Sequence, residues 1–468
     1  MRYSSLIIAS LVATTLSASA TEPETPAKWL DEPLPAAWNV PDSTSGPIAT
    51  SDRWWAGFHD TLLDTLITRG REANYDLASA AARIKMAQAQ LGQARAGYYP
   101  TVGVAASYTR TRMSGRTTSH DMDATVESYF SGTATMSWEI DVFGKVTAQV
   151  RSGKAQVRVS AAEYAAALNS LEAQIATTYV TLLADREQLE VARRHSESQQ
   201  HILNAAEERF EAGLNSKLDV AQARTLYYST IASIPMLEAE IESCVNALAV
   251  LLGTTAEGLP AGVGELRPLP DFRQYADLGT PSELLRRRPD VVEAERNIDL
   301  AAATLGIAKK EYLPSLSLQA SVGTAAHRFG DLFSRPSFTY SIAPTLSWTV
   351  FDGLSRRYGR IEAEERLHAA VDAYNMAVLN AVEEVRSAAT RYASCLRYIE
   401  SIEKVVDNAA ESTTLSFDLY RQGLTSFTNV DDAESNYLTY ENTQVTAHAE
   451  ALTALIDLFK ALGGAPLD

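Results

Sequence analysis

The side chains best suited to bind a metal ion are a few histidines and their acidic neighbours. His120, Asp121 and Asp123 stand close together, but they fall in a stretch that we expect to be a polar loop, where nothing fixes ligand geometry. His195 and His201 are six residues apart, which places them off a common helix face. The sequence therefore predicts no metal site.

Nucleophiles and phosphate-binding elements are equally sparse. The two cysteines, Cys244 and Cys395, are too few for a disulfide framework, and we expect both to remain unpaired. Three arginines at 286–288 precede Pro289, a favourable first helical residue, and we expect them to help organise a helix start. No phosphate loop, nucleophile elbow or dinucleotide fingerprint occurs. We predict no catalytic residue, no cofactor and no enzyme activity.

The net charge of the chain limits the classes of partner that it is suited to bind. The formal net charge is −17, and 46% of the residues are hydrophobic. An acidic chain does not suit nucleic acid, whose phosphates call for a basic face. The same charge is compatible with a cation-preferring conduit or simply with solubility.

The N-terminus reads as a secretory signal peptide over residues 1–20. Arg2 supplies the positive end, residues 6–16 the apolar stretch, and Ala18, Ser19 and Ala20 the small-residue cleavage site. The apolar run is about half a membrane span, which makes a membrane anchor the weaker reading. No cysteine follows at Thr21, so a lipid anchor is not expected. No later stretch suits a transmembrane helix, so any crossing of a membrane requires a β-barrel.

The remaining chain is written twice. The segment FEAGL at 210–214 returns as YRQGL at 420–424, a shift of 210 that also relates Trp138 to Trp348. Upstream the shift is 214, so four extra residues in the first copy lie between Pro100 and Ser137. Insertions of this size belong in loops.

Each copy has the same internal order. After a segment at 21–60, the first copy (61–253) should hold an Ala-rich helix over 61–96, a hairpin at about 101–142 and two long helices. The second copy (282–463) should repeat this with a helix over 282–312 and a hairpin at about 315–351. A Gly/Pro-rich linker at 254–281 separates them, and a tail follows at 464–468.

Four stretches of about ten residues alternate between apolar and polar side chains. The alternation over residues 130–142 is the clearest of them. It predicts strands with one face on lipid, with Trp138 and Trp348 facing lipid or its interface and Ser137 and Ser347 facing a lumen. A half-buried soluble sheet would alternate in the same way. Export, together with the lack of any other spanning element, favours the membrane.

Four strands cannot close a barrel around a useful lumen, and the edges of an open sheet cannot face lipid. The chain must therefore contribute its strands to a shared barrel. Three copies would supply twelve strands, an even number within the known range.

The helices are too long for a compact domain. Residues 154–212 and 360–422 contain neither Gly nor Pro, and at ~1.5 Å per residue each run reaches ~90 Å. The second run keeps a heptad pattern that predicts coiled-coil packing. One seam holds Val371, Val378, Val385, Tyr392, Ile399 and Val406, and the other holds Tyr374, Ala381, Ala388, Cys395, Ile402 and Ala409. Many seam residues are small, which suits a hollow helical cylinder or an ordinary Ala-rich bundle.

Several short motifs in order across both copies resemble the TolC-like outer-membrane efflux family, in its NodT/OprM-type branch. The resemblance covers nearly the whole mature chain. Its most specific pieces are Trp54-Trp55 with Phe58 and Leu63, Asn74-Tyr75-Asp76-Leu77, Tyr99-Pro100, residues 138–144, Arg287-Arg288-Pro289-Asp290-Val291, and Phe351-Asp352-Gly353.

The resemblance implies a fold that is mainly α with a transmembrane β part. A homotrimer would form a 12-strand barrel in the outer membrane, continuing into a long α-helical barrel in the periplasm. It also implies a periplasmic adaptor and an inner-membrane pump, commonly of the resistance-nodulation-division type, as partners. The function implied is passive exit of small molecules such as drugs and toxic compounds. The cysteine that anchors many members of this branch is absent here.

The periplasmic gate of the family lies where helix pairs turn around. Gly213 and Gly423 fit such turns, since glycine accepts the positive φ that ends a helix. By resemblance, Asp432 is the closing carboxylate, while Asp219 and Tyr420 tie the helix pairs together. Asp431 is the alternative constriction. The chain departs from the family in having Thr425 for an arginine and Asn429 for an aspartate, which predicts a thinner closing network.

Other functions stay open from sequence. The same architecture serves as the exit duct of type I protein secretion. A periplasmic coiled-coil adaptor or scaffold without a barrel is a different class. An exported enzyme is more remote, because no constellation of catalytic residues is present.

Overall fold

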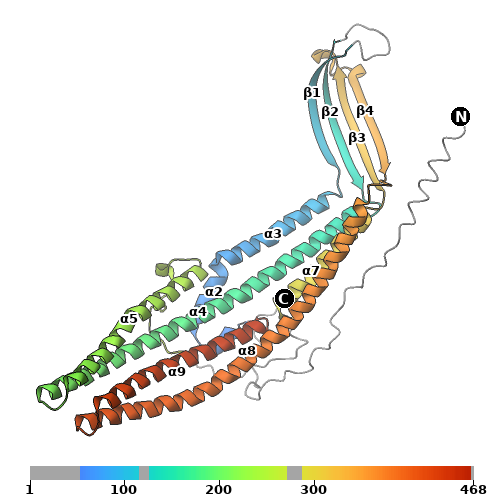
Figure 1. The fold of residues 1–468 in the computed structure, drawn as a ribbon. Coiled ribbons are helices and arrows are strands. Elements are labelled where there is room, and N and C mark those ends of the chain that lie inside the picture. Colours follow the sequence, from blue (N-terminus) through green and yellow to red (C-terminus); the bar gives the residue numbers. More distant parts are fainter. Residues whose placement is uncertain (1–52, 115–125, 271–286, 465–468) are drawn as a thin grey trace.

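The computed structural model describes residues 53–114, 126–270 and 287–464. Long helices run side by side over most of the molecule, and a small sheet stands at one end of them (Figure 1). The chain is mainly helical with a minor β part, as expected. The expected signal peptide (1–20), the segment up to residue 52, the stretch 120–123, Arg286 and the final residues 465–468 lie outside the described residues.

The elements follow one order in both halves. The first half contains η2 (Trp54–Phe58), α2 (Thr61–Ala73), α3 (Tyr75–Ala96), β1 (Thr101–Arg112), β2 (Val126–Ile140), α4 (Lys145–Glu211) and α5 (Lys217–Leu251). After η3 (Ala256–Gly258), the second contains α7 (Pro289–Lys310), β3 (Ser315–Ala326), η4 (Phe329–Asp331), η5 (Arg335–Ser337), β4 (Phe338–Ser347), α8 (Ser355–Arg421) and α9 (Phe427–Ala461).

One antiparallel sheet joins the two halves, in the order β1-β2-β3-β4. Its register lines up the alternating residues, so that Val104, Ala134, Val322 and Tyr340 stand opposite one another across the four strands. The next row is Gly103, Thr135, Ser321 and Ser341. Because side chains alternate along a strand, one face of the sheet is apolar and the other is small and polar.

The two long helices exceed the expected runs. α4 and α8 each have 67 residues, which corresponds to ~100 Å of helix. The Gly-free runs begin directly after Gly153 and Gly359. The helices begin earlier in the sequence and include these glycines. A single glycine costs a helix only about 1 kcal/mol, and packing along α4 and α8 outweighs that cost.

The expected helix over 61–96 is wrong in one respect, because it breaks at Asn74. This residue has an extended backbone and caps α3, its side-chain oxygen accepting from the Leu77 amide at 2.9 Å. Its side-chain nitrogen donates to the carbonyl oxygen of Leu251 at 2.9 Å, where α5 ends. Asparagine is a preferred N-cap. Here its side chain also joins the break between α2 and α3 to the C-terminus of α5.

The heptad seam of α8 is buried as predicted. Val371, Val378, Val385, Tyr392, Ile399 and Val406 are all buried, with Val385 and Tyr392 at 0% exposure. In the other seam Ala381 and Ile402 are buried, and Tyr374, Ala388, Cys395 and Ala409 are half-buried. The sustained heptad period thus identifies the face of α8 that packs.

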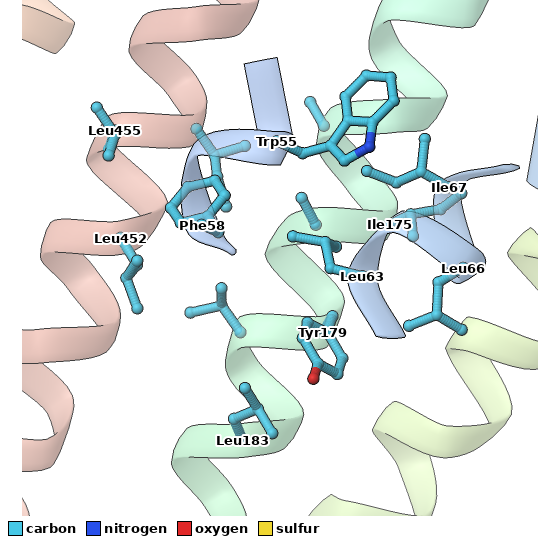
Figure 2. Close-up of a cluster of buried hydrophobic side chains, with 14 of the residues drawn as sticks. Trp55, Phe58, Leu63, Leu66, Ile67, Ile175, Tyr179, Leu183, Leu452 and Leu455 are labelled. Carbon is cyan, nitrogen blue, oxygen red and sulfur yellow. The ribbon is translucent and has the colours of Figure 1, made fainter. Parts of the chain in front are cut away.

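The largest core lies midway along the helices. There the short N-terminal helices η2 and α2 lie across α4 and α9, as Figure 2 shows. Trp54 stacks on Phe459 of α9 with ring centroids 5.3 Å apart. The labelled side chains of this core are Trp55, Phe58, Leu63, Leu66, Ile67, Ile175, Tyr179, Leu183, Leu452 and Leu455.

Arg288 organises more than the start of α7. Its buried guanidinium pairs with Asp290 of α7 and with Glu384 of α8, both at 2.6 Å. It also donates to the carbonyl oxygen of Ala461, in the last turn of α9, at 2.9 Å. A cation is favourable there, because helix C-termini carry partial negative charge. One side chain therefore joins three helices.

Both cysteines are free, as predicted. The Cys244 thiol donates to the Asp185 carboxylate at 3.3 Å. Burial and this carboxylate raise the pKa of Cys244 to about 12, which keeps the thiol protonated and unreactive. Within the ranges that the structure describes, no helix is long and apolar enough to cross a membrane.

Candidate functional site

The two turns at the far end of the helices are built alike. Gly213 and Gly423 have φ of +75° and +74°, where a side chain would strain the backbone. Leu214 and Leu424 each donate their amide to the carbonyl oxygen five residues earlier, which completes the Schellman motif. Figure 1 shows these turns together at the end opposite the sheet. The sequence therefore located both turns at the correct residues.

A small hydrophobic core holds the two turns together. Tyr420, Phe427 and Val430 come from α8 and α9 and are at most 2% exposed. They pack on residues of α4 and α5, namely Ile202, Leu203, Ala206 and Ala223. Separating the turns would expose these side chains to water, so this core holds the two turns together.

The bond partners of Asp219 and Tyr420 differ from the tie that the resemblance implied. The Tyr420 hydroxyl accepts from the side-chain nitrogen of Asn215 at 2.8 Å. The Asp219 carboxylate accepts from the Ser216 hydroxyl at 2.7 Å, while the Ser216 oxygen accepts from the Asp219 amide. Asp219 is therefore held in a capping arrangement at the start of α5, which explains why it does not reach Tyr420 within this protomer.

Arg209, which sequence reasoning did not single out, crosses between the helix pairs at the tip. Its guanidinium carbon lies 5.1 Å from the centre of the Tyr420 ring. One guanidinium nitrogen donates to the backbone oxygen of Arg421 at 2.8 Å, in the last turn of α8. The internal repeat carried a signal for this residue, because the second copy has Leu419 at the matching position.

The two positions that depart from the family pattern contact each other. Asn429 donates from its side-chain nitrogen to the Thr425 hydroxyl at 2.6 Å. A neutral pair one helical turn apart thus stands where the resemblance implies two opposite charges. The charge available to this part of the tip is correspondingly reduced.

The acidic pair at the start of α9 is accessible in the single chain. Asp432 is exposed, and Asp431 is half-buried. Burial, and then the charge of Asp432, raise the pKa of the Asp431 carboxyl. The structure thus leaves Asp432 free to meet solvent or another chain.

A buried polar cluster lies farther from the tip, where α4 crosses α9. His195 is 4% exposed and stands between Glu434 and Glu441, with nitrogen to oxygen distances of 2.9 and 2.7 Å. Burial by itself would lower the pKa of His195, but the bonds and charges of Glu434 and Glu441 raise it to about 9. At neutral pH the imidazole is therefore a cation between two carboxylates.

Trp138 of β2 and Trp348, which directly follows β4, occupy equivalent places. Trp138 donates its ring N–H to the carbonyl oxygen of Tyr98 at 3.0 Å, and Trp348 donates to that of Tyr312 at 3.1 Å. Both carbonyls lie in the turn between a helix and the strand that follows it. The indole nitrogens are thus satisfied by protein, which leaves the rings free to face an apolar surface.

The chain is similar to known proteins over most of its length. The sequence model of the family described as "Outer membrane efflux protein" matches residues 66–254 and 280–464. The pyoverdine export outer membrane protein OpmQ of Pseudomonas putida is 29% identical over 441 residues, covering 92% of each chain. Nodulation protein T of Rhizobium leguminosarum bv. trifolii is 26% identical, covering 86% of this chain and 85% of that protein.

Among solved structures, the outer-membrane channel OprN superposes with a TM-score of 0.84 at 28% identity. The superposition covers 94% of this chain and 99% of OprN. The likeness therefore extends over the sheet, the long helices and both tip turns, and is not confined to one part of the chain.

Proposed function

Since this chain belongs to the outer membrane efflux protein family, in its NodT/OprM-type branch, it is an outer-membrane efflux channel, and we propose that it serves as the passive exit duct of a tripartite pump. The family is one of channels and not of enzymes. The observation that carries the proposal is the pairing of an open, two-faced sheet with two 67-residue helices in one chain.

The duct would be a homotrimer. β1 pairs with β2 and β4 pairs with β3, so the two outer strands each keep one unpaired edge within the described part of the chain. Such edges are not tolerated against lipid. Joining β4 of one chain to β1 of the next would close twelve strands into a barrel in the outer membrane. The helices would then extend the lumen through the periplasm.

Each repeat of the chain would contribute to both the barrel and the helical part of the duct. Two repeats at 61–253 and 282–463 flank the linker at 254–281, each supplying two strands and two long helices. A periplasmic adaptor and an inner-membrane pump of the resistance-nodulation-division type would load the duct. Relatives named for pyoverdine, toluene or antibiotic export support small molecules as the cargo.

The turns at Gly213 and Gly423 would form the periplasmic gate. In a trimer, three copies of the α8–α9 turn would meet around the axis, with Asp432 as the narrowest acidic ring and Asp431 next to it. Tyr420 would hold the turns of one chain together, and Asp219 would fix the start of α5.

The apolar face of the sheet should contact lipid, including Trp138 and Trp348, while Ser137 and Ser347 face the lumen. Spin labels at Ala134 and Thr135 test this, because they belong to the apolar and polar rows of one strand. We expect the label at 134 to be accessible to a lipid-soluble quencher and the label at 135 to an aqueous one. The same environment at both positions would contradict the assignment.

The duct itself is tested with the purified full-length protein. We expect it to fractionate with the outer membrane, to migrate as a trimer without heating, and to give discrete conductance steps in planar bilayers. A monomeric protein that fractionates with the soluble periplasm and produces no conductance in bilayers would contradict the proposal and favour a scaffold.

A further inference from the structure

We propose that Arg209 and Asn215 form a clamp that holds the tip closed, acting on Tyr420 and on the C-terminus of α8; this proposal rests on the function proposed above. The clamp consists of the guanidinium of Arg209, the side-chain amide of Asn215, the Tyr420 side chain and the Arg421 backbone oxygen. It joins the α4–α5 turn to the α8–α9 turn within one protomer.

The amide of Asn215 has its orientation fixed by its two partners. Its side-chain nitrogen donates to the backbone oxygen of Ala206 at 3.0 Å as well as to the Tyr420 hydroxyl. A backbone oxygen only accepts, so nitrogen and not oxygen must face Ala206. The Tyr420 hydroxyl is therefore an acceptor in this contact, and an acidic residue at position 215 could not replace the donor.

Arg209 contributes in two ways at the end of α8. Its hydrogen bond satisfies the backbone oxygen of Arg421, and its charge lies at the negative end of the helix dipole. The same guanidinium lies over the Tyr420 ring, which is 2% exposed and meets Phe427 edge to face at 5.5 Å. Cation–π contacts gain strength where water is excluded.

These contacts substitute for the tie expected at Asp219. The Asp219 carboxylate is occupied by Ser216, and Thr425 and Asn429 bond each other. The two turns are thus joined by one cation and one amide, both acting on a buried tyrosine. Moving the α8–α9 turn away from α4 would break the Arg209 and Asn215 contacts together and expose Tyr420.

The test compares resting open probability of the reconstituted full-length channel in planar bilayers. Arg209→Met keeps the length of the side chain but removes its charge and donors, and we expect a roughly tenfold rise, the scale set by one charge-assisted hydrogen bond. Asn215→Leu should give a smaller rise, and the double variant no less than Arg209→Met alone. Conductance of the fully open state should stay unchanged in all three.

Lys217→Met is the matched control, because it also removes one cation from an exposed side chain of the same tip, outside the clamp. A resting open probability in Arg209→Met equal to that of the Lys217→Met control overturns the clamp. Should Arg209→Met fail to assemble, Arg209→Gln takes its place, with a severalfold rise expected and a wild-type value overturning the proposal. A wild-type protein that never conducts would instead contradict the proposed function as an exit duct.

Discussion

Replacing His195 with alanine should destabilise the folded chain by about 3–5 kcal/mol at pH 7, the range for breaking a buried ion pair from one side. The reason is the carboxylates that remain. Glu434 is 1% exposed and would lose its 2.9 Å contact with the imidazole. Glu441 would keep only Arg194 at 3.4 Å and the Tyr437 hydroxyl at 3.2 Å.

The pH dependence of this effect has a definite sign. The pKa of His195 is raised from 6.5 to about 9, so its contribution to stability is complete below about pH 6.5 and is lost as the pH rises through 9. For Glu441, burial alone would raise the pKa, but His195 and Arg194 lower it. Its contribution is therefore complete above about pH 4.5 and is lost as the pH falls through its lowered pKa.

Thermal unfolding of the detergent-solubilised protein, followed by circular dichroism from pH 5 to 10, measures the effect. The loss in His195→Ala should shrink toward pH 5, because a protonated carboxyl is cheaper to bury than a carboxylate. It should also shrink above pH 9, where the wild type loses the same interaction. His201→Ala, an exposed histidine of the same helix, is the control. A loss in His195→Ala that matches this control at pH 7 would refute the ion-pair argument.

This cluster also shows what local sequence patterns leave out. The only sequence relation available for His195 was its six-residue spacing from His201, which gave no site. Its partners Glu434 and Glu441 lie 239 and 246 residues away and meet it only because α9 packs along α4. A contact of that kind is set by tertiary packing and leaves no periodic signal in the sequence.

Features with a sustained period were predicted much better. The heptad of α8 identified its buried face from Val371 to Val406, because one spacing repeats over many turns. The glycine turns were located because a helix that ends in the αL conformation calls for glycine. The break at Asn74 was missed, since no proline marks it and a single capping residue decides the local structure.

At the tip, the position of Tyr420 was predicted from the sequence, but its hydrogen-bond partner was not. Tyr420 was placed correctly at the end of a long helix, but its bond partner was not, because Ser216 takes Asp219 and leaves Asn215 to reach the hydroxyl. The resemblance could give the position of the contact and not its chemistry. Where Arg209 and Asn215 stand, the second copy has Leu419 and Thr425, so comparing the two copies would have marked both residues.

Replacing Asp432 with alanine should strongly weaken the cation selectivity of the channel and its block by multivalent cations. Asp432 is exposed on the single chain, nine residues past Gly423, at the start of a helix that begins at the tip. In the proposed trimer, three such carboxylates would meet around the axis, and acidic rings of this kind select cations in other pores. Reversal potentials across a salt gradient, with and without a multivalent cation, measure both effects.

The pH dependence of cation selectivity provides a second measurement on the proposed Asp432 ring. Because close carboxylates do not ionise independently, selectivity should fade gradually as the pH is lowered, without a single sharp step. The pKa of Asp431 is already raised by burial and by the charge of Asp432, so its carboxylate is lost early in that titration.

Asp432→Asn, which keeps the shape and removes the charge, should reproduce the selectivity loss of Asp432→Ala. Asp418→Asn makes the same charge change at an exposed residue of α8 near the tip and serves as the control. Arg209→Met should open the gate more often without a comparable change in selectivity, since the clamp closes the tip and the ring filters ions. Unchanged selectivity and block in Asp432→Ala would place the constriction elsewhere, at Thr428 or Asp431.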